Sequence, residues 1–159
     1  MDLLQQVSGI DIRRRGVPGT QADLYIRGGG FDQTLLLIDG MKMDDIQTGH
    51  HTLNLLLPIQ LIERIEIIKG PASRIFGQNA FNGAINIVTK SLPKLDKKQF
   101  EMLVSNPTFG SFKQFGFLIN SRLSLKEKFN AQLTFSRSKS DGYRYNTDYD
   151  NSNYFVKSV

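Results

Sequence analysis

The fold is decided by residues 61–89, which read LIERIEIIKGPASRIFGQNAFNGAINIVT. Residues 64–69 alternate as a strand does, with Ile65 and Ile67 sharing one face. Residues 84–89, AINIVT, have strand character again. The stretch therefore predicts two strands that are joined by a compact connection.

The connection between these strands is predicted to contain a short helix. Gly70 allows a turn that a residue with a Cβ atom would resist, and Pro71 suits the first helical position because its missing N–H would be unpaired there anyway. Gly77 stands where such a helix would end. We therefore expect one or two helical turns over residues 71–76, followed by a loop of small residues at 78–83.

Two short motifs precede this stretch, and the order of all the motifs is informative. The two preceding motifs are Tyr25-Ile26-Arg27-Gly28 and Leu37-Ile38-Asp39-Gly40. The motifs within the deciding stretch are Ile65-Glu66, Lys69-Gly70-Pro71, Gly77, Ala80, Gly83 and Ile85-Asn86-Ile87-Val88-Thr89. In this order they resemble the plug domain of TonB-dependent outer-membrane receptors. A lone Ile-Arg-Gly or Asp-Gly would carry no information, whereas ordered motifs across residues 24–90 form a specific signal.

Composition places the chain among folded proteins and divides it into two regions. Its 159 residues are 40% hydrophobic and 22% charged, and none is cysteine, which excludes disulfides and thiolate metal sites. Residues 1–90 hold nine Lys and Arg against nine Asp and Glu, whereas residues 91–159 hold eleven against six and so carry the net charge of +5. The basic residues are scattered along alternating segments, so nucleic acid is not an expected partner.

The chain before residue 61 is predicted to form short elements of a small mixed sheet with short helices, an α+β domain. Asp39-Gly40 is its strongest hairpin signal and turns the chain tightly into residues 41–43. The other expected elements are a helix capped by Asp2 and ending at Gly9, strands at 10–13, 24–27 and 34–38, and a helical turn at 58–62.

Three features of this half invite an anion or metal site. The triple glycine at 28–30 lacks the Gly-Lys-Ser/Thr ending of a phosphate-binding loop, and nothing helical is predicted after it. The arginine run in residues 13–20 is interpreted as a solvated basic turn, with an anion contact as the alternative. His50 and His51 point in different directions and have no third ligand of the kind a closed metal site requires. We therefore expect no metal and no cofactor.

The chain changes character after a polar linker at residues 91–98. Apolar and polar residues then alternate, most cleanly at 129–136, in segments of about ten residues, which is the length that a tilted strand needs to cross a bilayer. The connection at 124–128 is short, while that at 139–153 is long and polar, as in outer-membrane barrels. Residues 99–159 are therefore predicted to be the first three to four antiparallel transmembrane strands of an incomplete β-barrel.

The resemblance implies a receptor of the Gram-negative outer membrane that takes up a scarce nutrient actively. Residues 1–90 would be its plug, without the N-terminal part, and would gate the barrel lumen. By resemblance, TonB would act through a segment upstream of this chain. The implied partners are TonB, outer-membrane lipid and a nutrient such as an iron–siderophore complex, cobalamin or an oligosaccharide.

The resemblance also implies roles for individual residues. Arg27, Glu66 and Lys69 would contact the barrel, because charged hydrogen-bonded pairs are strong when dry and weaken once water enters. The family more often has arginine where Lys69 stands, and lysine keeps the charge but loses the bidentate fork. The structural motif residues would be Gly28, Asp39, Gly40, Gly70, Pro71, Gly77, Gly83 and Asn86. The candidates for ligand contact are Arg15, Phe31, Gln33, His50 and His51.

Two other functional classes are weighed against the receptor. A soluble periplasmic ligand-binding module would use the first half alone, and the alternating segments of the second half argue against it. For an enzyme, the sequence offers no Gly-x-Ser-x-Gly, no His-Glu-x-x-His and no cysteine. The pair Asp44-Asp45 lies in turn-like surroundings without a partner base, so no catalytic residue is predicted.

Overall fold

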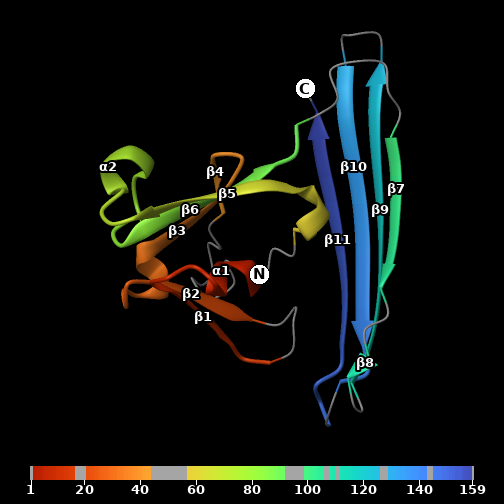
Figure 1. The fold of residues 1–159 in the computed structure, drawn as a ribbon, viewed down its shortest axis with the longest axis horizontal. Coiled ribbons are helices and arrows are strands. Elements are labelled where there is room, and N and C mark those ends of the chain that lie inside the picture. The colour runs from red at the N-terminus through yellow and green to blue at the C-terminus, as the bar shows by residue number, and fades with distance from the viewer. Residues whose placement is uncertain are drawn as a thin grey trace. The chain divides into compact units, whose positions relative to one another are not determined.

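The computed structural model describes residues 2–16, 21–43, 57–91, 99–105, 108–109, 112–125, 129–142 and 145–158. The chain forms two compact units (Figure 1). Unit 1 comprises Met1–Leu56 and Gln60–Lys90, and unit 2 comprises Leu57–Ile59 and Ser91–Val159. The boundary at Lys90 coincides with the change in charge balance along the sequence.

Unit 1 is built on a four-stranded mixed sheet with the strand order β4–β3–β6–β5. The strand β3 (Thr34–Ile38) runs parallel to β6 (Gly83–Thr89), whereas β4 (Met41–Lys42) and β5 (Ile62–Lys69) are antiparallel to their neighbours. A separate two-stranded sheet pairs β1 (Ile10–Arg14) with β2 (Ala22–Ile26). The short helical segments are α1 (Asp2–Gln5), η1 (Phe31–Gln33), η3 (Ile59–Leu61) and α2 (Ser73–Phe76).

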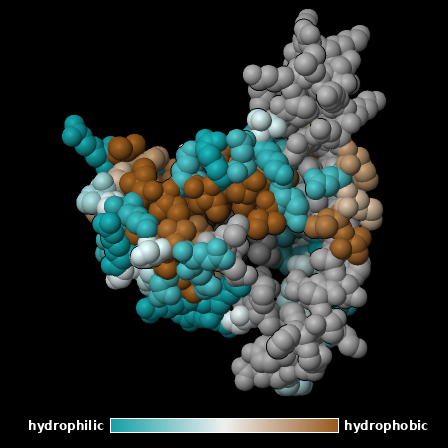
Figure 2. Space-filling model, viewed as in Figure 1, coloured by the Kyte–Doolittle hydropathy of each residue, from teal (hydrophilic) through white to brown (hydrophobic). Residues whose placement is uncertain are grey.

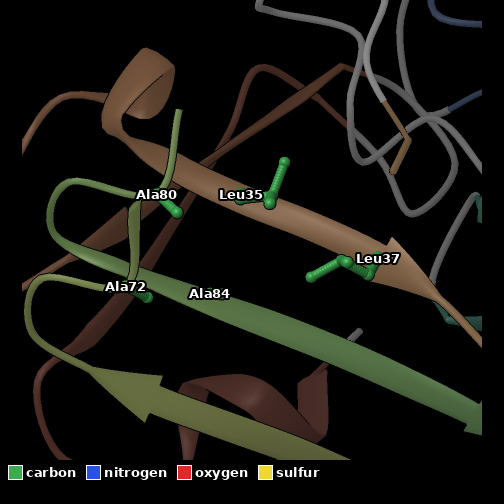
Figure 3. Packing of buried hydrophobic residues seen from close by; sticks show 5 residues of the cluster. All are labelled: Leu35, Leu37, Ala72, Ala80 and Ala84. Atoms are coloured by element: carbon green, nitrogen blue, oxygen red, sulfur yellow. The ribbon is translucent and has the colours of Figure 1, made fainter. Parts of the chain in front are cut away.

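The core of unit 1 lies along β3, all of whose residues are buried. A parallel strand with both faces covered is expected to be continuously apolar, as the sequence TLLLI nearly is. Leu35 and Leu37 pack with Ala84 of β6 and with Ala72 and Ala80, which flank α2 (Figure 3). Small side chains there let the backbone around α2 approach the sheet closely. Figure 2 shows a hydrophobic area on the visible face of unit 1, with hydrophilic atoms along its margins.

Most predicted elements of unit 1 are confirmed, including the hairpin at Asp39-Gly40, the strands on both sides of α2 and the helical turn at η3. Asp39 and Gly40 both have positive φ, 49° and 80°, as the tight hairpin turn requires. The helix at the N-terminus is shorter than expected, because α1 ends at Gln5 and a turn leads to Gly9.

Two expectations around the glycines are wrong. The helix α2 begins at Ser73 and not at Pro71, because the Ala72 N–H donates to the carbonyl of Ala80 at 2.9 Å and Ala72 serves as the N-cap. A helical element does follow the triple glycine, since the Gln33 N–H donates to the Gly30 carbonyl at 3.1 Å and closes the single turn of η1.

Unit 2 is an antiparallel sheet with the strand order β11–β10–β9–β7, and β8 (Thr108–Phe109) pairs with β9. Its main strands are β7 (Gln99–Ser105), β9 (Phe112–Leu125), β10 (Phe129–Ser140) and β11 (Tyr149–Ser158). The predicted antiparallel strands are therefore confirmed, and within the described residues the sheet does not close on itself. The predicted loop at 139–153 is shorter in the structure, because β10 continues to Ser140 and β11 begins at Tyr149.

The sheet of unit 2 buries polar side chains and exposes apolar ones. Gln132 and Thr134 of β10 are buried, whereas Leu133 between them is 48% exposed. Val156 of β11 is 68% exposed, and the exposed apolar residues of β7 are Phe100, Met102, Leu103 and Val104. A half-buried sheet of a water-soluble protein shows the opposite arrangement. Throughout the described residues, no helix is long and apolar enough to cross a membrane.

Candidate functional site

A chain of polar contacts crosses unit 1 from the hairpin turn to β5. The Gly40 N–H donates to the Asn86 side-chain oxygen at 3.0 Å, and the Asn86 amide donates to Glu66 Oε2 at 2.9 Å. The other carboxylate oxygen of Glu66 accepts from Arg64 at 2.8 Å. The hydrogen bond from Asn86, followed by the contact with Arg64, lowers the pKa of Glu66 from its ordinary value. Glu66 is thus engaged by residues of its own unit.

Asp39 fixes the end of β6, where the chain is about to leave unit 1. Its carboxylate accepts one hydrogen bond from the Thr89 backbone N–H at 2.8 Å and another from the Thr89 hydroxyl at 2.6 Å. The Asp39 N–H in turn donates to the Ile87 carbonyl at 2.9 Å. Through these hydrogen bonds, the Asp39 carboxylate holds the turn after β3 beside the end of β6, although the two segments are far apart in the sequence.

Arg27 and Lys69 both lie against the turn that joins α1 to β1. The Arg27 backbone N–H donates to the Gly9 carbonyl at 2.8 Å, and the Lys69 ammonium donates to the neighbouring carbonyl of Ser8. Arg27 is exposed, adopts a φ of 51°, and its guanidinium has no hydrogen-bond or ion-pair partner among the described residues. The structure therefore brings the two predicted cations to one turn, with Lys69 already bound to it.

The remaining motif residues shape the backbone. Gly28, Gly70 and Gly77 have φ values of 76°, 134° and 80°, which side chains with a Cβ rarely adopt. Gly77 caps α2, and Pro71 is an exposed residue before the N-cap. At Gly83 a Cβ atom would lie 2.3 Å from the Ile68 carbonyl oxygen, so β5 and β6 could not approach as they do.

Two of the ligand candidates, Arg15 and Phe31, lie against residues of β2. Arg15 forms an ion pair of 3.7 Å with buried Asp23. The ring of Phe31 meets that of Tyr25 edge to face, with centroids 6.5 Å apart, and Arg13 lies 4.7 Å from the centre of the same Tyr25 ring. A hydrogen bond to Asp11, followed by its charge, raises the pKa of Arg13. This surface offers two aromatic rings and the guanidinium N–H donors of two ion-paired arginines to a bound molecule.

Gln33 belongs to the same turn, η1, as Phe31 and is joined to the loop after α2. Its side-chain oxygen accepts from the Asn82 amide at 2.7 Å and its carbonyl from the Asn82 N–H at 2.9 Å. His50 and His51 lie outside the described residues, and those residues contain no group of three side chains that would hold a metal ion.

Sequence reasoning missed Tyr25 and Asn82 as members of these surfaces. Tyr25 is the one residue of β2 that is not buried, and its aromatic side chain between Leu24 and Ile26 is the signal that could have identified it. Asn82 occupies the space that a side chain at Gly29 would need, since a Cβ there would lie 1.4 Å from the Asn82 amide nitrogen. A run of glycines signals such a close approach.

Comparison with known proteins identifies the fold and the family. The sequence model of the TonB-dependent Receptor Plug Domain family matches residues 1–84. The vitamin B12 transporter BtuB of Vibrio vulnificus (strain YJ016) is 31% identical over 146 residues, which cover 92% of this chain and 23% of that protein. BtuB of Vibrio cholerae (strain M66-2) is 28% identical over 142 residues, 89% of this chain and 22% of that protein.

Solved structures show the same fold. The siderophore receptor PirA from Pseudomonas aeruginosa superposes with a TM-score of 0.75 at 23% identity, over 99% of this chain and 28% of that one. The pyoverdine outer membrane receptor FpvA from Pseudomonas aeruginosa PAO1 gives a TM-score of 0.70 at 13% identity, over 99% and 22% of the two chains. The chain thus spans about a quarter of the length of these proteins. From the ordered motifs, the mixed sheet that they build and the family match across residues 1–84, the chain belongs to the TonB-dependent receptor plug-domain family.

Proposed function

We propose that this chain is the plug, with adjoining barrel strands, of a receptor for the active uptake of a scarce nutrient such as an iron–siderophore complex or cobalamin. Receptors of this family are outer-membrane proteins of Gram-negative bacteria, and this chain belongs among them. The family consists of transporters and receptors. The proposed process is gated passage, in which the plug opens the lumen of the barrel and no covalent bond is made or broken.

The observation that carries the proposal is the combination of the two units. Unit 1 has the sheet and the motifs of the plug family, and unit 2 is a sheet of long antiparallel strands that exposes apolar side chains and buries polar ones. Such a sheet suits lipid on one side and a polar lumen on the other. This arrangement disfavours a soluble periplasmic binding module, because Leu133 and Val156 would then face water.

Contact between plug and barrel is assigned to charged residues of unit 1. Among the three candidates, Arg27 is the best placed, because its guanidinium has no partner among the described residues and its fork can bind a carboxylate in two places. Lys69 uses one of its three N–H donors on Ser8 and keeps two for the barrel. Glu66 is held by Asn86 and Arg64, so we assign it a role in the plug sheet first.

The nutrient would bind to plug surfaces that include Arg15, Phe31 and Gln33, with His50 and His51 as further candidates. The rings of Phe31 and Tyr25 offer apolar area. Arg13 and Arg15 are paired with Asp11 and Asp23, and their remaining guanidinium N–H groups can donate hydrogen bonds to a bound molecule. A ligand that combines flat or apolar parts with hydrogen-bond acceptors fits this chemistry. TonB is proposed as the partner that supplies energy, through a segment upstream of the residues described here.

The experiment that tests the proposal is nutrient uptake by cells that carry the full-length receptor gene. Deletion of the gene or of TonB is expected to abolish uptake of at least one labelled ferric siderophore or cobalamin, and the full-length gene is expected to restore it. Arg27→Ala is expected to change uptake or plug retention, while Arg74→Ala, an exposed arginine of α2, serves as the matched control. Uptake that persists without TonB would contradict the proposal.

A further inference from the structure

One face of the β10–β11 pair carries a regular sequence of side chains along the strands. The two strands lie side by side over their length (Figure 1). Five residue pairs lie on this face, and the first, Ala131 with Ser158, combines a buried residue with an exposed polar one. The other four are Leu133 with Val156, Phe135 with Tyr154, Arg137 with Ser152, and Lys139 with Asp150. Directly paired residues of an antiparallel sheet project to the same side. We call the surface formed by these last four pairs the Leu133 face.

The side chains on the Leu133 face are more exposed than those on the opposite face of the same strands. Seven of its eight residues are exposed and the eighth, Phe135, is partly covered. The residues of β10 on the opposite face, from Gln132 to Ser140, are all buried or half-buried, and they are polar. The Leu133 face is therefore the exposed side of this strand pair, and its first row, Leu133 with Val156, is apolar.

The chemistry of the Leu133 face changes in a fixed order along the strands. Leu133 and Val156 form an apolar row, and the rings of Phe135 and Tyr154 follow, with centroids 4.9 Å apart and planes inclined at 41°. The apolar character continues across the sheet to Met102 and Val104 of β7. The register places Met102 opposite the same residue of β9 as Phe135, and Val104 opposite the same residue as Arg137. Beyond the rings, every pair on this face contains a charged side chain.

The charged end of the face holds one ion pair and one additional cation. Arg137 binds Asp150 in two places, Nε to Oδ1 at 3.0 Å and one terminal nitrogen to Oδ2 at 2.6 Å. Lys139 stands opposite Asp150, and its ammonium forms no ion pair with a described carboxylate. Arg137, Lys139 and Asp150 together carry one net positive charge. Asp141 and Asp148 lie in the connection beyond them and not on a paired position of the face.

This order is the depth profile of one half of a lipid bilayer. Hydrocarbon accepts Leu and Val, aromatic rings gather where hydrocarbon meets headgroups, and Lys and Arg extend into the headgroup layer. We propose that the Phe135–Tyr154 pair marks the outer edge of the hydrocarbon layer, and that Arg137 and Lys139 bind a phosphate group of an outer-leaflet lipid. The inference rests on the proposed function, because it requires that unit 2 be part of a barrel in the outer membrane.

The outer leaflet is assigned from the connections. The connection from β10 to β11 spans residues 141–148, whereas that from β9 to β10 spans residues 126–128, and long connections lie outside the cell in outer-membrane barrels. The charged end of the Leu133 face adjoins the longer connection. Phosphate is the expected group because Arg137 keeps three N–H donors after binding Asp150 and Lys139 keeps three.

The depth assignment is tested by single cysteines in the full-length receptor in intact cells. The present residues contain no cysteine, so Leu133→Cys and Lys139→Cys would each add the one thiol of this segment. A membrane-impermeant maleimide is expected to label Lys139→Cys and to leave Leu133→Cys unlabelled. Ready labelling of Leu133→Cys in a folded receptor would overturn the proposed function itself, because that face would then be in water.

The phosphate assignment is tested by binding of purified lipid A and of its dephosphorylated form to the full-length receptor in detergent, followed by native mass spectrometry. Lys139→Gln is expected to weaken lipid A binding about fivefold, the equivalent of about 1 kcal/mol per surface cation. Lys157→Gln, on the opposite face of β11, is the matched control and is expected to bind as the parent does.

A further variant separates lipid binding from a structural role. Asp150→Asn releases Arg137 from its carboxylate and is expected to strengthen lipid A binding, whereas loss of a purely structural ion pair would not. The phosphate assignment is overturned if dephosphorylated lipid A binds as tightly as lipid A, or if Lys139→Gln and Lys157→Gln behave alike. If either of these results is obtained while Leu133→Cys stays unlabelled by the maleimide, only the phosphate assignment fails and the proposed function still stands.

Discussion

The carboxylate of Asp39 accepts two hydrogen bonds from Thr89, 50 residues away in the sequence. Asp39 belongs to the hairpin turn after β3, and Thr89 is the last residue of β6. The parallel pairing of β3 with β6 leaves their C-terminal ends side by side, which is why a turn residue can reach the end of the other strand. The contact fixes the segment through which unit 1 continues to Lys90.

Asp39→Asn is expected to loosen this end of the sheet. Asparagine also tolerates a positive φ, so the turn itself should survive. However, the asparagine side chain has one oxygen that can accept hydrogen bonds, whereas both oxygens of Asp39 accept one. The expected loss is about 1–3 kcal/mol of local stability. Hydrogen exchange in the full-length receptor should show the Thr89 amide exchanging roughly tenfold faster or more. Asp32→Asn, at an exposed residue of η1, is the control, and equal effects of the two substitutions would contradict the assignment.

Gly83→Ala is expected to be more damaging than Gly40→Ala. Both glycines have positive φ, but a Cβ at Gly40 would meet no atom within 4 Å, whereas one at Gly83 would lie 2.3 Å from the Ile68 carbonyl oxygen. Gly40→Ala should therefore cost about 1–2 kcal/mol for its backbone alone. Gly83→Ala should add about 1–3 kcal/mol because β5 must move. Exchange rates of the β6 amides in the full-length receptor measure the difference, and equal rates would refute the close approach.

The Glu66 carboxyl is expected to titrate below the ordinary glutamate value, and Asn86→Ala should raise its pKa more than Arg64→Ala does, because the hydrogen bond from Asn86 is the larger cause. Because the pKa of Glu66 is lower in the folded protein than in the unfolded chain, the contact stabilises unit 1 fully at pH values above the ordinary glutamate pKa of about 4.3. This stabilisation is lost as the pH falls through the lowered pKa of the folded protein. A carboxyl NMR titration checks the order of the two variants. Asn82→Ala, whose amide bonds Gln33 and no carboxylate, should leave the Glu66 titration unchanged.

The sequence predicts the architecture well because each strand carries its own local signal. Alternation predicts β5 and β10, and a glycine turn predicts the hairpin after β3. The start of α2 was misplaced because a hydrogen bond from Ala72 to Ala80 decides it. That bond depends on how the loop folds back after the helix, and local propensity at Pro71 contains no such information.

The candidate site was less accessible to sequence reasoning. The residue types were informative, since Arg27 and Lys69 could be singled out from their motifs. Their meeting at the Ser8–Gly9 turn could not be foreseen, because it depends on the three-dimensional course of three separate segments. The same applies to Gln33 and Asn82, which are 49 residues apart and meet only because β3 and β6 pair in parallel register.

Lys69→Gln is expected to release the Ser8–Gly9 turn. The lysine ammonium binds the Ser8 carbonyl, and loss of such a partly exposed hydrogen bond should cost about 0.5–1.5 kcal/mol. Hydrogen exchange at the Ile10 amide, which bonds the Val7 carbonyl within the same turn, is the measurement in the full-length receptor. Lys42→Gln in β4 is the matched control. If Lys69 instead acts only on the barrel, Lys69→Gln would weaken plug retention and leave exchange at Ile10 unchanged.

The 159-residue chain by itself is expected not to refold as a soluble monomer in the absence of detergent. Unit 2 exposes Leu133, Tyr154 and Val156 on one side and leaves β7 and β11 as strand edges, a combination that favours aggregation in water. Size-exclusion chromatography after dilution from denaturant should show aggregates, and detergent should reduce them. Leu133→Ser combined with Val156→Ser should increase the soluble fraction, whereas Ser136→Ala on the opposite face should not. A sharp two-state transition of a monomer without detergent would contradict the expectation, because it would mean that this apolar face has found a dry interior within the chain.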